Sequence, residues 1–230
     1  MKSILLSVRK YFCSIILLAH VSMMFAQSSD WGLWTSIDAE KKLSKKWELD
    51  VAAQYRMNDH ISVTDQIRGS VDVSRKTGKF VKLGFGYELI AKNKVKQDMY
   101  VYRNRFRVQA TGSYKYARFT ASWRTRIQLT LLENNNKPDV DNQKWVWRNR
   151  FGLKYDIKKT PLKPYINFEL FHQLFSDLEY SYYQNRFSTG IEYSLNKRNT
   201  IEAGYKLETE AIGAYKNKLN VVNLGYIYSF

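Results

Sequence analysis

The most constraining feature of this sequence is an alternation of apolar and polar residues that continues from residue 31 to the carboxyl terminus. A β-strand places successive side chains on opposite faces, so each alternating run predicts a strand with one apolar and one polar face. Residues 47–57 show the pattern clearly, with an apolar face formed by Trp47, Leu49, Val51, Ala53, Tyr55 and Met57. We count 11 such segments, separated by turn residues. The pattern predicts an all-β chain and is typical of a single antiparallel, up-and-down transmembrane β-barrel.

The last segment, residues 219–230, favours a barrel over a soluble sheet. Its apolar face carries Tyr226, Tyr228 and Phe230. A soluble domain rarely ends on such a strand, because an exposed aromatic edge invites aggregation. In a transmembrane barrel the same strand closes the sheet with its aromatic side chains facing lipid. These three residues resemble a carboxyl-terminal assembly signal, which implies the outer-membrane barrel assembly machinery and membrane lipid as partners. An edge strand of a soluble β-sandwich is the alternative.

The amino terminus agrees with export. Basic residues precede an apolar run over residues 11–25, and Ala26–Gln27 is a plausible cleavage point, which predicts a signal peptide over residues 1–26. A membrane-anchoring helix is disfavoured because the run is shorter than the roughly 20 apolar residues that a span needs. The single cysteine, Cys13, lies in this segment. The mature domain, residues 27–230, therefore has no disulfide or thiol chemistry.

Composition fits a barrel in the outer membrane of a Gram-negative bacterium. The mean hydropathy is −0.48, and no later apolar run approaches the length of a spanning helix, which excludes a helical membrane protein. A barrel can be this polar because only alternate residues meet lipid. The net charge of +16 raises the possibility of nucleic-acid binding. The basic residues alternate along strands and the signal peptide exports the chain, so we predict no nucleic-acid partner.

The number of strands is less certain than their existence. Bacterial single-chain barrels have even strand counts because both termini lie in the periplasm. Short turns near residues 45, 77, 115, 160 and 197 would then be periplasmic, and connections near 60, 94, 138, 178 and 214 would be extracellular, the longest being residues 133–143. The first segment, beginning at Trp31, would start on the wrong side. We therefore expect ten or twelve strands, with twelve slightly preferred.

The polar faces are rich in charge and define the candidate site. We predict a charge network in the lumen made of Arg56, Arg68, Arg103, Arg105, Arg107, Arg124, Arg126, Arg148, Arg150, Glu169, Arg186, Glu192, Glu202 and Lys206. Buried charges must be paired, and guanidinium–carboxylate geometry suits a narrow interior. One interpretation is a lumen filled by these pairs, in a barrel that is structural or passively permeable to small solutes. The alternative is a narrow anion-preferring channel, because rings of arginine favour anions.

The mature chain carries five short motifs, which comprise Trp123, Arg124 and Arg126; Arg148, Arg150 and Phe151; Pro164, Tyr165, Glu169 and Phe171; Asn185, Arg186, Phe187, Gly190 and Tyr193; and Leu195, Lys197, Ile201, Gly204 and Tyr205. Together these motifs resemble a known bacterial family, domain of unknown function 2490. The resemblance implies an exported outer-membrane barrel of about this length and no established activity. Glu169 and Arg186, on adjacent predicted strands, are the pair that we expect to matter most, with a structural role.

Other chemistry is weakly supported. An outer-membrane lipase would need a serine beside His172, and the candidate Ser176 and Ser181 lie in the following loop without a recognisable motif. The mature domain has only His60 and His172 and no cysteine, so we predict no metal site and no cofactor. We predict no catalytic residues. Ligand binding by the extracellular loops is a further alternative, and the sequence predicts no particular oligomeric state.

Overall fold

In a computed structural model, described over residues 29–132, 143–175, 182–210 and 218–230, eleven strands and one short 3₁₀ helix, η1 (Val95–Gln97), follow one another. The strands are β1 (Ser29–Lys42), β2 (Trp47–Asn58), β3 (Val63–Lys76), β4 (Val81–Lys94), β5 (Met99–Tyr116), β6 (Phe119–Leu132), β7 (Gln143–Tyr155), β8 (Leu162–Leu174), β9 (Tyr182–Ser194), β10 (Asn199–Glu210) and β11 (Lys218–Ser229). In these ranges no helix has the length and apolar character needed to cross a membrane.

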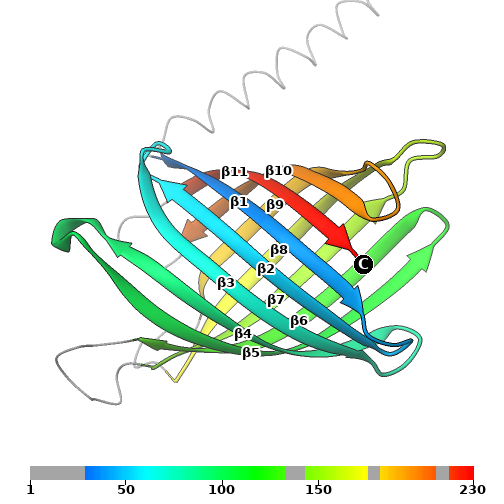
Figure 1. Ribbon diagram of the computed structural model, residues 1–230, viewed down its shortest axis with the longest axis horizontal. Coiled ribbons are helices and arrows are strands. Elements are labelled where there is room, and N and C mark those ends of the chain that lie inside the picture. The colour runs from blue at the N-terminus through cyan, green and yellow to red at the C-terminus, as the bar shows by residue number, and fades with distance from the viewer. Residues whose placement is uncertain (1–28, 133–142, 176–181, 211–217) are drawn as a thin grey trace, which may run out of the picture.

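The eleven strands form one closed barrel. Each strand pairs antiparallel with its neighbours in sequence, from β1–β2 round to β10–β11. The barrel closes where β1 meets β11, and this pair is parallel, with Ile37 in register with Tyr226. Figure 1 shows the blue β1 and the red β11 side by side and running in the same direction. Closure leaves no free sheet edge, as a transmembrane barrel requires.

The all-β barrel is confirmed, and eleven strands fall between the expected ten and twelve, but the preference for twelve was wrong. That preference assumed that the first and last strands run in opposite directions. The stretch beginning at Trp31 is a full barrel strand, and it pairs with β2 on one side and β11 on the other. An odd number of up-and-down strands closes when the first and last are parallel, and barrels with odd strand counts exist.

The two ends of the barrel differ in their connections. Short turns over residues 43–46, 77–80, 117–118, 156–161 and 195–198 gather at the end where β11 finishes. The opposite end carries the β2–β3 connection, η1 and the connections that contain residues 133–142, 176–181 and 211–217. Residues 133–142 of the predicted loop lie outside the described residues, and its last residue, Gln143, begins β7. The predicted signal segment, residues 1–26, and its cleavage point at Ala26–Gln27 also lie outside them.

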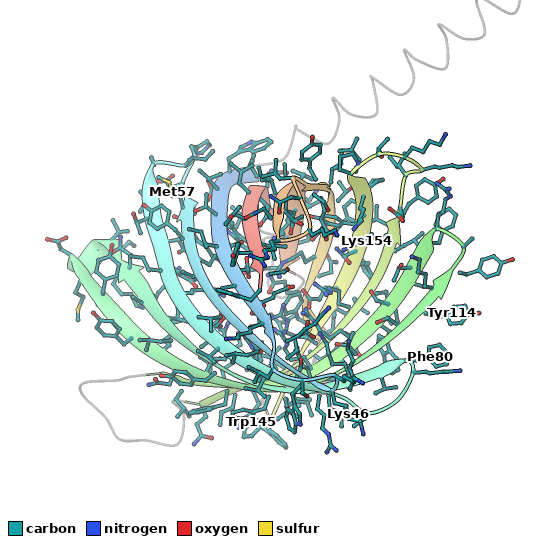
Figure 2. The ribbon with its side chains drawn as sticks, turned by 45° about the vertical axis from the view of Figure 1, so that its right-hand side comes forward. Lys46, Met57, Phe80, Tyr114, Trp145 and Lys154 are labelled. Atoms are coloured by element: carbon teal, nitrogen blue, oxygen red, sulfur yellow. The ribbon has the colours of Figure 1, made fainter. Side chains whose placement is uncertain are left out.

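The outward face is apolar and solvent-accessible along every strand. Representative outward side chains are Ile37, Val51, Ile67, Phe85, Val108, Trp123, Phe151, Ile166, Ile191, Ile201 and Leu224, all of them exposed. Near the short turns, Phe80 and Tyr114 also point away from the barrel, with ring centroids 5.7 Å apart (Figure 2). A soluble protein rarely exposes so continuous an apolar surface. Period-2 alternation thus separates an apolar exterior from a polar interior.

The carboxyl-terminal strand is held from both sides. The backbone N–H of Phe230 donates to the carbonyl of Glu40 on β1 over 2.9 Å. On the other side, the Tyr226 hydroxyl contacts the side-chain oxygen of Asn199 on β10. The rings of Tyr228 and Phe230 meet edge to face with centroids 4.7 Å apart. The aromatic end of the chain is therefore part of the seam that closes the barrel.

The parallel seam predicts a specific cross-link. Ser36 and Gly225 are register partners, and a Cβ atom at position 225 would lie 3.2 Å from the Ser36 Oγ. We expect the double variant Ser36→Cys/Gly225→Cys to form a disulfide after oxidative refolding, detected as a linked peptide by mass spectrometry. The control pairs Ser36→Cys with Ile227→Cys, two residues further along β11. That pair is separated by about 8 Å and should stay reduced, because a disulfide needs Cα atoms within about 7 Å. Linkage of the control but not of the test pair would contradict this register.

Candidate functional site

Side chains from all eleven strands meet across the middle of the lumen. We call this set the arginine–carboxylate belt and define it as Trp34, Arg56, Arg68, Asp72, Glu88, Arg105, Arg107, Arg124, Arg148, Glu169, Phe171, Arg186, Lys206, Glu208 and Asn223. Its members are inward-facing on their strands, as the alternation predicted. They form two carboxylate-centred clusters and an aromatic bridge.

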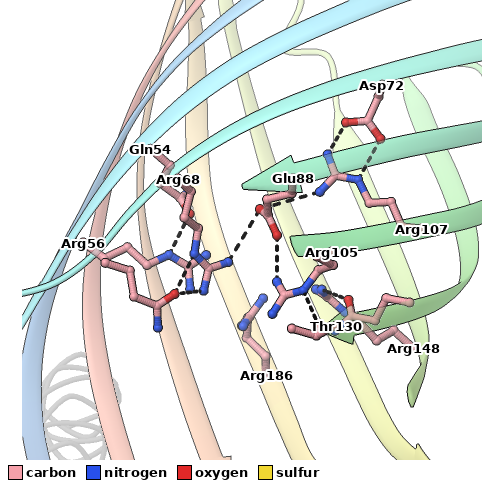
Figure 3. Close-up of polar contacts among 12 residues, drawn as sticks. Gln54, Arg56, Arg68, Asp72, Glu88, Arg105, Arg107, Thr130, Arg148 and Arg186 are labelled. Atoms are coloured by element: carbon pink, nitrogen blue, oxygen red, sulfur yellow. Dashed lines mark hydrogen bonds and ion pairs between the residues drawn. The ribbon is translucent and has the colours of Figure 1, made fainter. Parts of the chain in front are cut away.

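The first cluster surrounds Glu88 on β4. Its carboxylate lies 2.7 Å from the Arg105 guanidinium on β5, 3.7 Å from Arg68 on β3 and 3.6 Å from Arg107 (Figure 3). Arg105 also donates to the Thr130 hydroxyl over 2.9 Å. Glu88 is buried, so this carboxylate depends on its three cationic partners for charge compensation.

A glycine extends this cluster across a strand. Arg107 on β5 makes a two-pronged contact with the carboxylate of Asp72 on β3, and β4 lies between them. The strand between them has Gly86 at the crossing point, where a Cβ atom would come within 2.6 Å of the Arg107 Nε. Any side chain there would displace the pair. Gly86 is therefore required by a close approach inside the lumen.

The second cluster surrounds Glu169 on β8. Its two oxygens accept from Arg124 over 2.9 Å, Arg148 over 2.9 Å and Arg186 over 3.3 Å. The expected proximity of Glu169 and Arg186 is therefore present, but Glu169 serves two further arginines. Its side chain is only 4% exposed, which makes it the most deeply buried carboxylate among the ion pairs of the described residues. Arg186 reaches on to Glu208 on β10.

Aromatic side chains bridge the second cluster to Arg56 on β2. The Arg56 guanidinium lies 3.5 Å from the centre of the Trp34 ring, and Arg186 and Lys206 lie 5.1 and 5.2 Å from it. Phe171 contacts Arg148 and Arg186 in the same way, at 4.5 and 5.0 Å. Stacking on a ring face stabilises a cation that has been removed from water. Trp34 was missed as a site residue, although its place on the polar face of the first alternating segment was the available signal.

Several predicted arginines have amide partners, which for Arg68 are additional to its contact with Glu88. Arg56 donates to Gln54 over 2.6 Å, Arg68 to Gln66 over 2.8 Å and Arg126 to Gln109 over 2.9 Å. Neither Arg126 nor Arg103 forms an ion pair within the described part of the chain, and the Arg103 Nε has no hydrogen-bond partner there. Not every arginine in the predicted network is therefore paired with an acid.

Glu192 and Glu202 lie apart from the arginines, near the short turns. Glu192 accepts from Lys154 over 2.5 Å. Glu202 accepts from the Tyr165 hydroxyl over 2.6 Å and from the Asn223 amide over 2.9 Å. Tyr165 reaches Glu202 because β9 and β10 carry glycine where it crosses, and a Cβ atom at Gly190 would lie 2.7 Å from its hydroxyl. These carboxylates belong to the lumen but contact no arginine directly in the described residues.

Two cavities extend from the belt toward the short turns. One, of about 610 Å³, lies among β6 to β10, and the other, of about 430 Å³, lies among β1 to β6. Five cations line both cavities: Arg124, Arg148, Arg150, Arg186 and Lys206. The larger cavity includes the exposed Lys115 and the half-buried Arg118 beside the β5–β6 turn, so it opens at that end of the barrel.

The remaining candidates sit outside the lumen. His172 packs against Trp147 and Tyr182, with ring centroids 5.4 and 5.8 Å away. Ser176 and Ser181, the only serines weighed as its partners, lie outside the described residues. Asp30, Asp59 and His60 cluster at the opposite end, where the Asp30 carboxylate accepts backbone N–H groups of Asp59 and His60 over 2.9 Å each. That carboxylate thus holds the β2–β3 connection in place.

The comparisons with known proteins agree with this architecture. The family described as "Protein of unknown function (DUF2490)" matches residues 31–218. The chain belongs to the DUF2490 family. No curated protein matches the sequence. The match begins within β1 and ends at the first residue of β11, so it includes one of the two strands that form the parallel seam.

Solved outer-membrane barrels share the fold of this DUF2490 protein at low sequence identity. LpxR from Salmonella typhimurium is 9% identical, with a TM-score of 0.53 over 84% of this chain and 87% of that one. The NanC porin is 11% identical, with a TM-score of 0.56 over 87% of this chain and 98% of that one. At these identities the likeness concerns the barrel fold alone.

The belt predicts that Glu169 is a major source of stability. We expect Glu169→Gln to lower the free energy of unfolding by about 3 kcal/mol, because removing the shared acceptor leaves buried guanidinium groups uncompensated. Urea unfolding in detergent, followed by tryptophan fluorescence, measures this change. The control is Glu192→Gln, whose side chain is 18% exposed and serves one lysine; we expect a loss below about 1 kcal/mol. Equal losses in the two variants would contradict the central role of Glu169.

Proposed function

We propose that this DUF2490 protein is an outer-membrane barrel whose lumen is closed at mid-height by the arginine–carboxylate belt, and that its primary role is structural. The observation that carries the proposal is that charged, aromatic and amide side chains, with at least one from every strand, contact one another across the lumen. Glu88, Arg107 and Glu169 are all buried, although they point into the space that a channel would leave open. An eleven-stranded barrel is wider than the barrel of about eight strands that side chains just fill, and here long guanidinium side chains meet across its middle.

Three features support residence in the outer membrane. The exposed apolar side chains cover the outside of every strand, as a lipid-facing surface requires. The interior is polar, which suits a barrel and not a soluble sandwich. The aromatic residues at 226, 228 and 230 end the closing strand, where an assembly machine can engage the last strand. We propose membrane lipid and that machinery as the partners, with the short-turn end in the periplasm.

Membrane residence predicts a depth-dependent cost of charge on the outer face. Val108, at the middle of β5, is 61% exposed, and Tyr116, beside the short turn, is 72% exposed. We expect Val108→Arg to destabilise the barrel in lipid vesicles, with a free energy of unfolding lower by about 2–4 kcal/mol. We expect Tyr116→Arg to lower it by about 1 kcal/mol or less. Denaturant titration in vesicles measures both. Equal, small effects in the two variants would contradict a lipid-facing outer surface centred on the middle of the strands.

A narrow anion-preferring channel is the second candidate. The observation that favours it is the surplus of arginine over carboxylate on β6 and β7, where Arg126 and Arg150 form no ion pair with a described acid. Rings of basic side chains attract anions to a constriction. This surplus lies on one side of a lumen that the belt crosses, so we place the channel second.

Conductance distinguishes the two candidates. For a closed barrel we expect the refolded wild type to give no steady current steps in a planar bilayer. Trp34, only 3% exposed, stacks between cations at the centre of the belt. Trp34→Ala removes this plug without changing charge, and we expect it to produce small steps whose reversal potential under a salt gradient shows anion preference. The lipid-facing control Trp123→Ala should stay silent, and steady steps from the wild type would favour the channel.

A further inference from the structure

The larger of the two cavities, which we call the basic chamber, has an unusual balance of charge. It runs from the belt to the end of the barrel where the chain terminates, and roughly two lining cations are present for every carboxylate. At its open rim, Lys115 is exposed and Arg118 is half-buried, so both side chains have access to solvent. The informative residue is deeper. Arg150 projects from β7 into the chamber and is partly accessible through it.

The carboxylates deep in the basic chamber are already engaged. Glu169 divides its two oxygens among three other arginines, and Glu192 accepts from Lys154. Glu202 accepts from Tyr165 and Asn223. The Arg150 guanidinium consequently forms no hydrogen bond or ion pair with any described residue, although Glu169 is its register partner on β8. A guanidinium with five donors is thus left inside the lumen without an acceptor in the described part of the chain.

The neighbouring strand β6 adds further positive charge beside Arg150 without adding a carboxylate. Arg150 lies directly opposite Arg124 on β6, and the next inward pair on the same two strands is Arg126 opposite Arg148. Like charges directly opposite one another destabilise a sheet. In addition, the Nε atoms of Arg124 and Arg148 are buried without an acceptor among the described residues. These are two consecutive like-charge pairs, and only one arginine of each pair contacts the Glu169 carboxylate. The arrangement raises the free energy of the folded barrel, and an anion between the pairs would offset that cost.

We propose that the basic chamber binds a small solute carrying a phosphate group, with Arg150 as its principal contact. A phosphate presents several acceptor oxygens and about two negative charges, so it can bridge guanidinium groups on adjacent strands. A volume of about 610 Å³ is within the range of small-molecule sites. Because Arg150 lies inside the lumen and not on the lipid-facing surface, the ligand is a soluble phosphate and not the headgroup of a bilayer lipid. The site exists whether or not the barrel conducts.

The test is calorimetric titration of the refolded mature barrel with inorganic phosphate, in a sugar detergent that contains no phosphate and at constant ionic strength set with chloride. We expect saturable binding of one phosphate per chain. Arg150→Gln should weaken it about tenfold or more, the effect of losing a hydrogen bond to a charged partner. The matched control is Arg103→Gln, which removes the same charge from a lumen arginine outside both cavities and should change the affinity less than about twofold.

Thermal unfolding separates binding from structure. Without phosphate, Arg150→Gln should unfold at the same temperature as the wild type or higher, because it relieves the repulsion with Arg124. With phosphate, only the wild type and Arg103→Gln should be stabilised. If Arg150→Gln does not refold, Arg150→Lys keeps the charge but loses the planar fork, and it should still bind more weakly than the wild type.

Three results would overturn the proposal. The first is a wild-type titration no different from a titration with added chloride. The second is an equal loss of affinity in Arg150→Gln and Arg103→Gln, which would indicate a response to net charge alone. The third is phosphate binding that disappears when phosphocholine detergent replaces the sugar detergent, which would assign the site to a lipid headgroup.

Discussion

The structure depends on the need to pair every strand edge. In a barrel that crosses a membrane, an unpaired backbone has no water to bond to, so the first and last strands must meet. With eleven up-and-down strands these two run in the same direction, and the only closure available is the parallel β1–β11 seam. The seam fixes the chain's ends: β11 finishes at the short turns, whereas β1 begins at the end with the longer connections. It also brings Trp34 into register with Asn223, which places the bridging tryptophan beside the second cluster.

Closure at eleven strands determines what the lumen must contain. The interior of so small a barrel is narrow enough for side chains from opposite walls to touch, and alternation fills it with polar groups. Buried charges are tolerated when they are compensated, and here a few carboxylates are shared among many arginines. Sharing requires reach across intervening strands. The Asp72–Arg107 contact passes over β4 and the Tyr165–Glu202 contact passes over β9, and in each case the strand that is crossed has glycine at the crossing point.

The sequence was a good guide to the faces of the strands and a poor guide to partners. Period-2 alternation is a local property, so the outward Val108 and the inward Arg107 follow directly from their neighbours. The strand count failed because the even-number rule concerns where the termini lie, which alternation does not encode. The predicted pair of Glu169 and Arg186 is present, but the further partners could not be predicted, because the tilt of the strands decides which inward side chains share a level. Glu169 was expected beside Arg186, but its contacts with Arg124 and Arg148 join β8 to β6 and β7 at once. Trp34 was overlooked because an aromatic residue on a polar face reads as an exception until its cationic neighbours are known.

The distribution of charge within the lumen indicates more than a need for neutrality. On β1, β2 and β3 the carboxylates of Glu40, Asp50 and Asp72 form a row of directly opposed like charges, just as Arg124 and Arg150 do on β6 and β7. If compensation were the only constraint, acids and bases would alternate around the barrel and both rows would be avoided. Instead both rows line the smaller cavity, and the arginine row also lines the basic chamber. The arginine row raises the energy of the folded barrel, and the phosphate group that we propose for the basic chamber would lower it. The belt agrees with the lumen that we propose to be closed, and the arginine row is the part of the short-turn end where the proposed phosphate site lies.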